Sequence, residues 1–95
     1  MAEPSISVTN NREASRYESR VDGHLSVITY EARHDGSVAL LHTEVAPELS
    51  GRGIGAAMVR AALEDARREG LKVVPVCSYV TSFLERHPEY DDVLA

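Results

Sequence analysis

One short stretch decides how the chain is organised: Ser50-Gly51-Arg52-Gly53-Ile54-Gly55. Pro47 stops the strand-like segment before it, and a helical pattern follows it to about Glu69, where Gly70 is a natural C-terminal stop. Glycines allow close approach of the backbone to a ligand, and the amides of a first helical turn lack intrahelical partners. The stretch therefore suits a phosphate or pyrophosphate. The alternative is a turn whose glycines only permit tight packing between helix and sheet.

The helical pattern has one apolar side. Small and apolar residues recur at three- and four-residue intervals, whereas the opposite side carries arginines and a glutamate. We expect the apolar side to face a sheet. Its members are Gly55, Met58, Val59, Ala62, Leu63 and Ala66.

Three segments before the glycines read as antiparallel strands. They are rich in β-branched, leucine and tyrosine residues, and Asp22-Gly23 and His34-Asp35-Gly36-Ser37 separate them as turns. A short buried strand after the helix can return parallel to the strand before it, which makes a βαβ unit. We therefore predict an α/β (α+β) fold with a mixed sheet and a short C-terminal helix ending near His87-Pro88. The strands are expected at Tyr17–Val21, Leu25–Arg33, Val38–Val45 and Lys72–Val76, with a further first strand at Ile6–Val8.

Length and composition predict one globular domain spanning residues 1–95, since 43% of the residues are hydrophobic and 26% are charged. A net charge of −5 gives no electrostatic footprint for nucleic acid or an anionic membrane, so neither is expected as a partner. One cysteine cannot form an internal disulfide, and the histidines lack metal-ligand spacing, so no metal site is predicted. No apolar segment approaches the roughly 20 residues that span a bilayer. We expect a soluble cytoplasmic protein.

Two groups of motifs resemble a known family. The run His42-Thr43-Glu44-Val45-Ala46-Pro47, with the glycine stretch as far as Val59, resembles the acetyl-CoA-binding core of the GCN5-related N-acetyltransferase superfamily. The runs Val74-Pro75-Val76-Cys77-Ser78-Tyr79-Val80 and Arg86-His87-Pro88-Glu89-Tyr90 are similar to its very small, single-domain members. The glycines match neither a Rossmann G-x-G-x-x-G nor a P-loop. The resemblance extends from about Tyr17 to Leu94 and implies the minimal fold of that superfamily.

The resemblance implies acetyl-CoA, or CoA, bound between two splayed parallel strands. The pantetheine would pair with backbone near Glu44, Val45 and Ala46. Most superfamily loops begin with Arg or Gln where this chain has Ser50, so we expect weaker rather than absent binding. The side chain of Arg52 either pairs with a phosphate oxygen or is solvated. The implied pyrophosphate site comprises Gly51, Arg52, Gly53, Ile54, Gly55 and Ala56.

Acetylation of an amine needs a base for the amine and an acid for the departing thiolate. Many superfamily members have a tyrosine acid in the last helix, where this chain has Phe83, so Tyr79 and Cys77 are the nearest substitutes. The thiol of Cys77 could protonate CoA, accept the acetyl group itself, or be an inert core hydrophobe.

His42 and Glu44 are the candidate bases. Side chains alternate along a strand, so both should share one face, directed toward the splayed gap, with histidine the better base. Structural or solvated roles are the alternatives for each. The sequence thus predicts acetyl-CoA-dependent transfer to an amine, on a small molecule or on a peptide or protein lysine. The alternatives are a non-catalytic CoA-binding sensor or interaction module, and a regulatory domain for another anion. It does not decide between monomer and homodimer.

Overall fold

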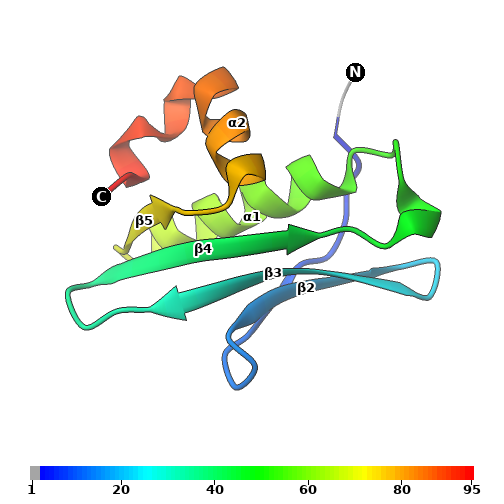
Figure 1. Ribbon diagram of the computed structural model, residues 1–95, viewed down its shortest axis with the longest axis horizontal. Coiled ribbons are helices and arrows are strands. Elements are labelled where there is room, and N and C mark those ends of the chain that lie inside the picture. The colour runs from blue at the N-terminus through cyan, green and yellow to red at the C-terminus, as the bar shows by residue number, and fades with distance from the viewer. Residues whose placement is uncertain (1–2) are drawn as a thin grey trace.

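The computed structural model describes residues 3–95 as a five-stranded mixed sheet with helices packed on one face (Figure 1). The strands lie side by side in chain order; the first four are antiparallel, and the fourth and fifth are parallel. This confirms the predicted α/β (α+β) fold with its βαβ unit. The elements are β1 (Thr9–Asn11), β2 (Arg16–Val21), β3 (His24–Ala32), β4 (Ser37–Glu44), the 3-10 helix η1 (Pro47–Leu49), α1 (Ile54–Arg68), β5 (Lys72–Pro75), α2 (Ser78–Arg86) and the 3-10 helix η2 (Pro88–Val93).

The first strand lies three residues later than predicted. Ile6–Val8 is outside any strand, and β1 instead pairs with β2, with Asn11 opposite Arg16. The turn between these two residues fixes the register, so pairing extends backward from Asn11 for only three residues. Ile6 and Val8 pack half-buried against the core, because an extended apolar segment can bury its side chains without joining a sheet.

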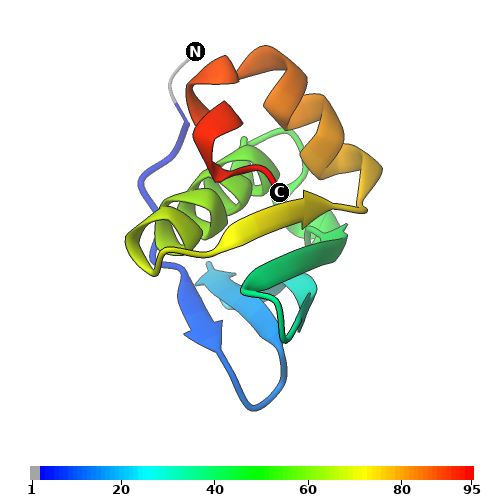
Figure 2. The ribbon, with the colours of Figure 1, turned by 90° about the vertical axis from the view of Figure 1, so that its left-hand side faces the viewer.

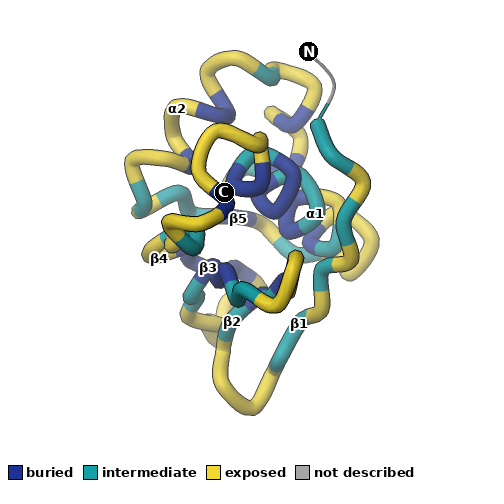
Figure 3. Tube along the Cα trace, turned by 90° about the vertical axis from the view of Figure 1, so that its right-hand side faces the viewer, coloured by how far each residue is buried: buried dark blue, intermediate teal, exposed yellow. Residues whose placement is uncertain are grey.

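The hydrophobic core lies between α1 and the sheet. All six residues of the predicted apolar side of α1 are buried, and Figure 3 shows the buried positions gathered where the helix meets the strands. Gly70 has a φ of 71°, the left-handed conformation that commonly ends a helix. Within residues 3–95 the other face of the sheet has no helix over it (Figure 2). None of the helices in that range combines the length and apolar character needed to cross a membrane.

The fifth strand is less buried and one residue shorter than predicted. Of its residues only Val73 is buried, and Val76 beyond its end is 55% exposed. The outer edge of β5 is covered by the end of the chain, where Leu94 forms a parallel bridge with Val73 and the Ala95 amide donates to the Val73 carbonyl at 3.0 Å. A strand that closes the edge of a small sheet needs little burial of its own.

The His-Pro-Glu-Tyr motif joins the end of the chain to α1. His87 ends α2, and its ring stacks on Phe83 at 4.1 Å between centroids. The Tyr90 hydroxyl donates to Glu64 at 2.6 Å and accepts from Arg60 at 3.1 Å. These contacts give the motif a structural role, and α2 ends next to His87, as the sequence predicted.

Candidate functional site

The two parallel strands separate close to the end of β5. Their pairing runs from Ser37 opposite Lys72 to Leu40 opposite Pro75, and the amides of Val76 and Cys77 then both donate to the Leu40 carbonyl. Beyond this point the chain turns into α2. In the described part of the chain, the remainder of β4 pairs only with β3. One edge of β4 is therefore free to pair with an extended ligand.

A β-bulge at Leu41 sets which side chains of β4 face the helices. Leu40 pairs with Tyr30 and His42 pairs with Thr29, so Leu41 is an extra residue. The bulge changes the phase of the strand, which leaves both Leu40 and Thr43 on the face toward the helices.

His42 and Glu44 share one face, as predicted, but it is the face opposite the helices. Thr43 pairs with the buried Ile28 on the helix-covered face, and its two neighbours alternate away from it. The side chains of His42 and Glu44 are 64% and 73% exposed, with Nε2 of the histidine 3.9 Å from Oε1 of the glutamate. Both follow the end of the β4–β5 pairing, so they flank the separation point from the uncovered side of the sheet.

A cavity of about 340 Å³ lies at the start of α1. Gly51 and Gly53 line it with φ angles of 79° and 76°, conformations that glycine adopts without strain. Gly53 is the N-cap of α1, and no side chain caps the helix. The first-turn amides are therefore free to donate to a ligand in the cavity. The complete lining is Val45, Ala46, Pro47, Leu49, Ser50, Gly51, Gly53, Ile54, Gly55 and Tyr79.

Tyr79 forms the wall of this cavity over the start of α1. A Cβ atom on Gly55 would lie 2.6 Å from the Tyr79 hydroxyl, so the missing side chain makes room for the phenol ring. Within the glycine stretch, Gly51 and Gly53 shape the loop, and Gly55 permits close packing against Tyr79 of α2, where the alternative interpretation expected packing against the sheet. Tyr79 remains 41% exposed.

Three residues of the predicted cofactor site lie beside this cavity rather than in its lining. The guanidinium of Arg52 points away to Asp22, with 2.8 Å between nitrogen and oxygen. Ala56 belongs to the first turn of α1 but packs partly against the core. Glu44 lines a neighbouring hollow with His24 and Glu48, which shares Val45, Ala46 and Pro47 with the first cavity.

Cys77 is the N-cap residue of α2, and its half-buried sulfur lies 3.5 Å from Oγ1 of Thr43. Burial of the thiol acts to raise its pKa. The Thr43 hydroxyl and the amides of Val80 and Tyr79 together outweigh the effect of burial. The pKa of the thiol therefore lies below its ordinary value. The backbone amide of Thr43 adds a smaller contribution in the same direction. Sequence alternation alone missed Thr43, because the bulge at Leu41 is what turns it toward the sulfur.

The sequence profile described as "GCN5-related N-acetyl-transferase" matches residues 16–93 of this chain. The chain belongs to the GCN5-related N-acetyltransferase family. Protein NATD1 of Xenopus tropicalis is 31% identical over 86 residues, covering 88% of this chain and 79% of that protein. Human Protein NATD1 is 32% identical over 85 residues, covering 87% of this chain and 75% of the human protein.

The chain is also similar in structure to a protein from Staphylococcus aureus, described as GCN5-like, whose solution structure was determined by NMR. The two superpose with a TM-score of 0.73 and 28% sequence identity, covering 95% of this chain and 88% of the other. The fold neighbour agrees with the minimal GCN5-related fold that the sequence motifs indicated.

Phe83 is the position at which the resemblance to the GCN5-related superfamily predicts a tyrosine acid. Its ring is fully buried, stacks on His87 and lies 5.3 Å from the Arg60 guanidinium. The side chain has no group that can donate a proton. In this family member the position is part of the core.

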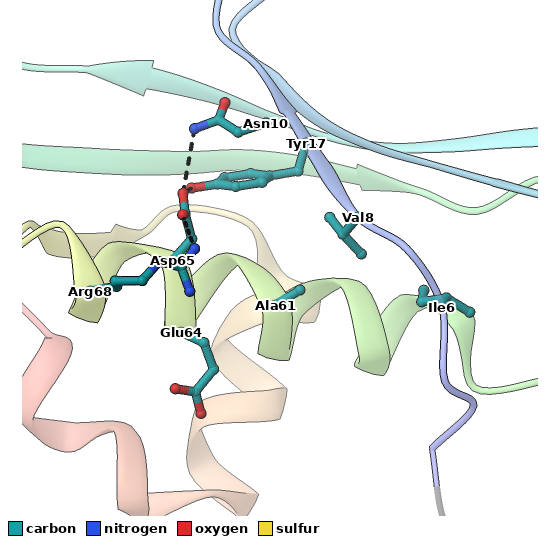
Figure 4. A pocket seen from close by; sticks show the side chains of 8 residues that line it. All are labelled: Ile6, Val8, Asn10, Tyr17, Ala61, Glu64, Asp65 and Arg68. Atoms are coloured by element: carbon teal, nitrogen blue, oxygen red, sulfur yellow. Dashed lines mark hydrogen bonds and ion pairs between the residues drawn. The ribbon is translucent and has the colours of Figure 1, made fainter.

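A second cavity, of about 350 Å³, lies between α1 and the N-terminal segment (Figure 4). The carboxylate of Asp65 is central to it, and accepts from the Tyr17 hydroxyl at 2.8 Å and from Asn10 at 3.4 Å. Arg68 also pairs with this carboxylate. Burial, followed by the bond to Asp65, raises the pKa of Tyr17. Because these polar groups satisfy one another, the contacts link β2 to α1 and offer no ligand chemistry. Residues 3–95 contain no group of three metal-ligating side chains.

Proposed function

We propose that the chain is an acetyl-CoA-dependent N-acetyltransferase that acts on an amine. The observation that carries the proposal is the cavity that joins the uncapped start of α1, lined by Gly51 and Gly53, to Val45 and Ala46, the two residues that follow β4 and its free edge. One ligand with an anionic middle and an extended amide arm fits both features. Family membership supports the acetyltransferase class.

The residues present fit acetyl-CoA. The first-turn amides from Gly53 to Ala56 would hold the pyrophosphate, because these donors lack intrahelical partners and the helix dipole favours an anion there. The backbone at Glu44, which ends β4, and at Val45 would pair with the pantetheine amides. Ala46 is less suited than predicted, because its amide donates to the Ser26 hydroxyl at 3.0 Å and its carbonyl accepts from the Leu49 amide at 2.9 Å. When bound, acetyl-CoA would supply the acetyl group as a thioester with a thiolate leaving group.

The two faces of the sheet would divide the proton transfers between them. The imidazole of His42, with the carboxylate of Glu44 3.9 Å away, would take the proton of an amine arriving from the uncovered face. The thiol of Cys77 lies on the helix-covered side of the same strand. Its lowered pKa suits a thiol that must give up its proton, whether to the leaving sulfur or to become a nucleophile.

The open approach to His42 and Glu44 suits an amine on a peptide or protein as well as a small amine, and the net charge of −5 favours cationic acceptors. Location in the cytoplasm and a single folded domain remain predictions. The oligomeric state is part of the same test, because a second copy could enclose the acceptor side.

Transfer of labelled acetyl groups from acetyl-CoA to a panel of small amines and lysine peptides tests the proposal. We expect wild-type protein to transfer the label, and Cys77→Ala and His42→Ala to reduce transfer about 100-fold or more while retaining CoA binding in a thermal-shift assay. His34→Ala is the matched control, since His34 is exposed in the turn between β3 and β4. Locating any label retained on Cys77 separates a nucleophile from a proton donor.

One observation favours a second candidate, a CoA-binding module without turnover. Phe83 is buried and cannot donate a proton, so the acid implied by the superfamily resemblance is missing at that position. Wild-type protein that binds CoA but transfers no label to any amine would favour this module. Native mass spectrometry that detects a different retained anion would favour a regulatory domain over both.

A further inference from the structure

Thr43 of β4 contacts Cys77 across the boundary between β4 and α2. Its Oγ1 atom lies 3.5 Å from the sulfur. The bulge at Leu41 makes this contact possible, because it places Thr43 on the helix-covered face while its neighbours His42 and Glu44 lie on the other face. The only hydroxyl that the described residues bring to this sulfur therefore comes from the strand whose edge is free.

We propose that Thr43 positions the Cys77 sulfur through this hydrogen bond, which its hydroxyl accepts from the thiol and would donate to the thiolate, and so holds the sulfur beside the free edge of β4. The proposal rests on the function proposed above for Cys77, although the contact itself does not involve acetyl-CoA. A hydroxyl accepts from a thiol and donates to a thiolate, so the contact persists in both protonation states. It is stronger with the charged sulfur.

Among the groups around the sulfur, the Thr43 hydroxyl makes the largest contribution that favours the thiolate. The backbone amides of Val80, Tyr79 and Thr43 itself add smaller contributions, burial opposes them, and no charged side chain is among the causes of the lowered pKa. A substitution of the Thr43 side chain leaves all three amides in place. The titratable side chains on the elements packed around the sulfur are His42 and Glu44 of β4, Lys72 of β5, and Tyr79, Glu85 and Arg86 of α2.

The chain has a single cysteine, so alkylation by iodoacetamide reports on Cys77 alone. The rate is measured as a function of pH for the full chain without CoA, comparing wild type with Thr43→Val and Thr43→Ser. We expect the midpoint of the Thr43→Val profile to move up by about one pH unit, as for the loss of one hydrogen bond to a charged acceptor. The Thr43→Ser profile should match wild type, because serine restores the hydroxyl.

A Thr43→Val profile that superposes on wild type would overturn the proposal. So would a Thr43→Ser profile that moves as far as that of the valine variant, because the methyl group and not the hydroxyl would then be responsible. If the valine variant does not fold, Thr43→Ala against Thr43→Ser provides the same comparison.

Acetyl transfer is measured separately with the same variants. A shifted profile in a protein that never transfers acetyl would leave the positioning role intact and reject the proposed function. Transfer by a protein whose profile is unchanged by Thr43→Val would do the reverse.

Discussion

Gly55 and Tyr79 act as a pair at the start of α1. The phenol lies where the side chain of any other residue at position 55 would have to go, and it forms one wall of the cavity proposed for CoA. Gly55 is inside the helix and has no positive φ, so alanine suits its backbone and improves helix propensity by about 1 kcal/mol. The cost of alanine is therefore displacement of the phenol and not a loss of folding.

We predict that Gly55→Ala remains folded and weakens CoA binding by displacing Tyr79. Isothermal titration should give weaker binding for Gly55→Ala and for Tyr79→Ala, with no further loss in the double variant, because both changes remove the same wall. Losses that add in the double variant would contradict the pairing. Ser78→Ala is a suitable control, since Ser78 is the exposed neighbour of Tyr79.

At this scale the glycine positions could be predicted and their separate tasks could not. Gly51 and Gly53 adopt positive φ angles, as a glycine stretch between strand and helix indicates. The task of Gly55 depends on a tyrosine 24 positions away in α2, and nothing in the local sequence reports that contact.

A negative charge at the start of α1 would have two opposing effects. A glutamate in the first turn stabilises the helix through its dipole, and at the same place it repels a pyrophosphate. Ala56 is the third residue of α1, within reach of the free amides, and the helix has no acidic residue in its first turn.

We predict that Ala56→Glu is more stable than Ala56→Gln but binds CoA more weakly. The two side chains have the same stem, so any cost of packing it against the core cancels in the comparison. The dipole contribution of about 0.3–1 kcal/mol corresponds to about 2–6 °C in Tm for a domain of this size. Thermal melts with and without CoA measure both effects. Glutamate and glutamine variants with equal affinity would mean that the anion does not bind at this helix end.

Among the elements, the strands and α1 follow from patterns of residues, whereas the bulge in β4 does not. The adjacent Leu40 and Leu41 interrupt the alternation and are the one signal that precedes the change of phase. Without the bulge, alternation would place Thr43 on the same face as Leu41. The contact between Thr43 and Cys77 could therefore not be anticipated from the sequence. The hydrophobic pattern likewise does not predict the polar strand β1, because a turn fixes the register of that strand.

Across the whole molecule, Arg60 joins segments that are far apart in the chain. Its guanidinium donates to Glu3 at 2.7 and 2.9 Å and to the Tyr90 hydroxyl at 3.1 Å, from the same helix whose start is the proposed pyrophosphate site. The segment that Glu3 anchors also brings Pro4 within 3.1 Å of the position of a Cβ on Gly53. The ion pair thus fixes a segment that lies directly behind the proposed pyrophosphate loop.

This ion pair predicts a pH-dependent contribution to stability. The hydrogen bond from Arg60 lowers the pKa of Glu3 below its ordinary value of 4.5, against a smaller opposing effect of burial. A carboxyl whose pKa is depressed by folding stabilises the protein above its unfolded pKa and loses that contribution as the pH falls through its folded pKa. We predict that Glu3→Gln lowers the free energy of unfolding by about 0.5–1 kcal/mol at pH 7, as for a partly exposed pair.

The difference between wild type and Glu3→Gln should shrink as the pH falls below about 4.5 and vanish once Glu3 is protonated. Urea denaturation at intervals from pH 7 to pH 3 measures it. Glu13→Gln serves as control, because Glu13 is exposed in the turn between β1 and β2. A Glu3→Gln difference that stays constant over this range would mean that the segment is held by packing of Ile6 and Val8 and not by charge. The ion pair would then orient the Glu3 segment without stabilising the protein. Apolar contacts alone would hold that segment behind the loop.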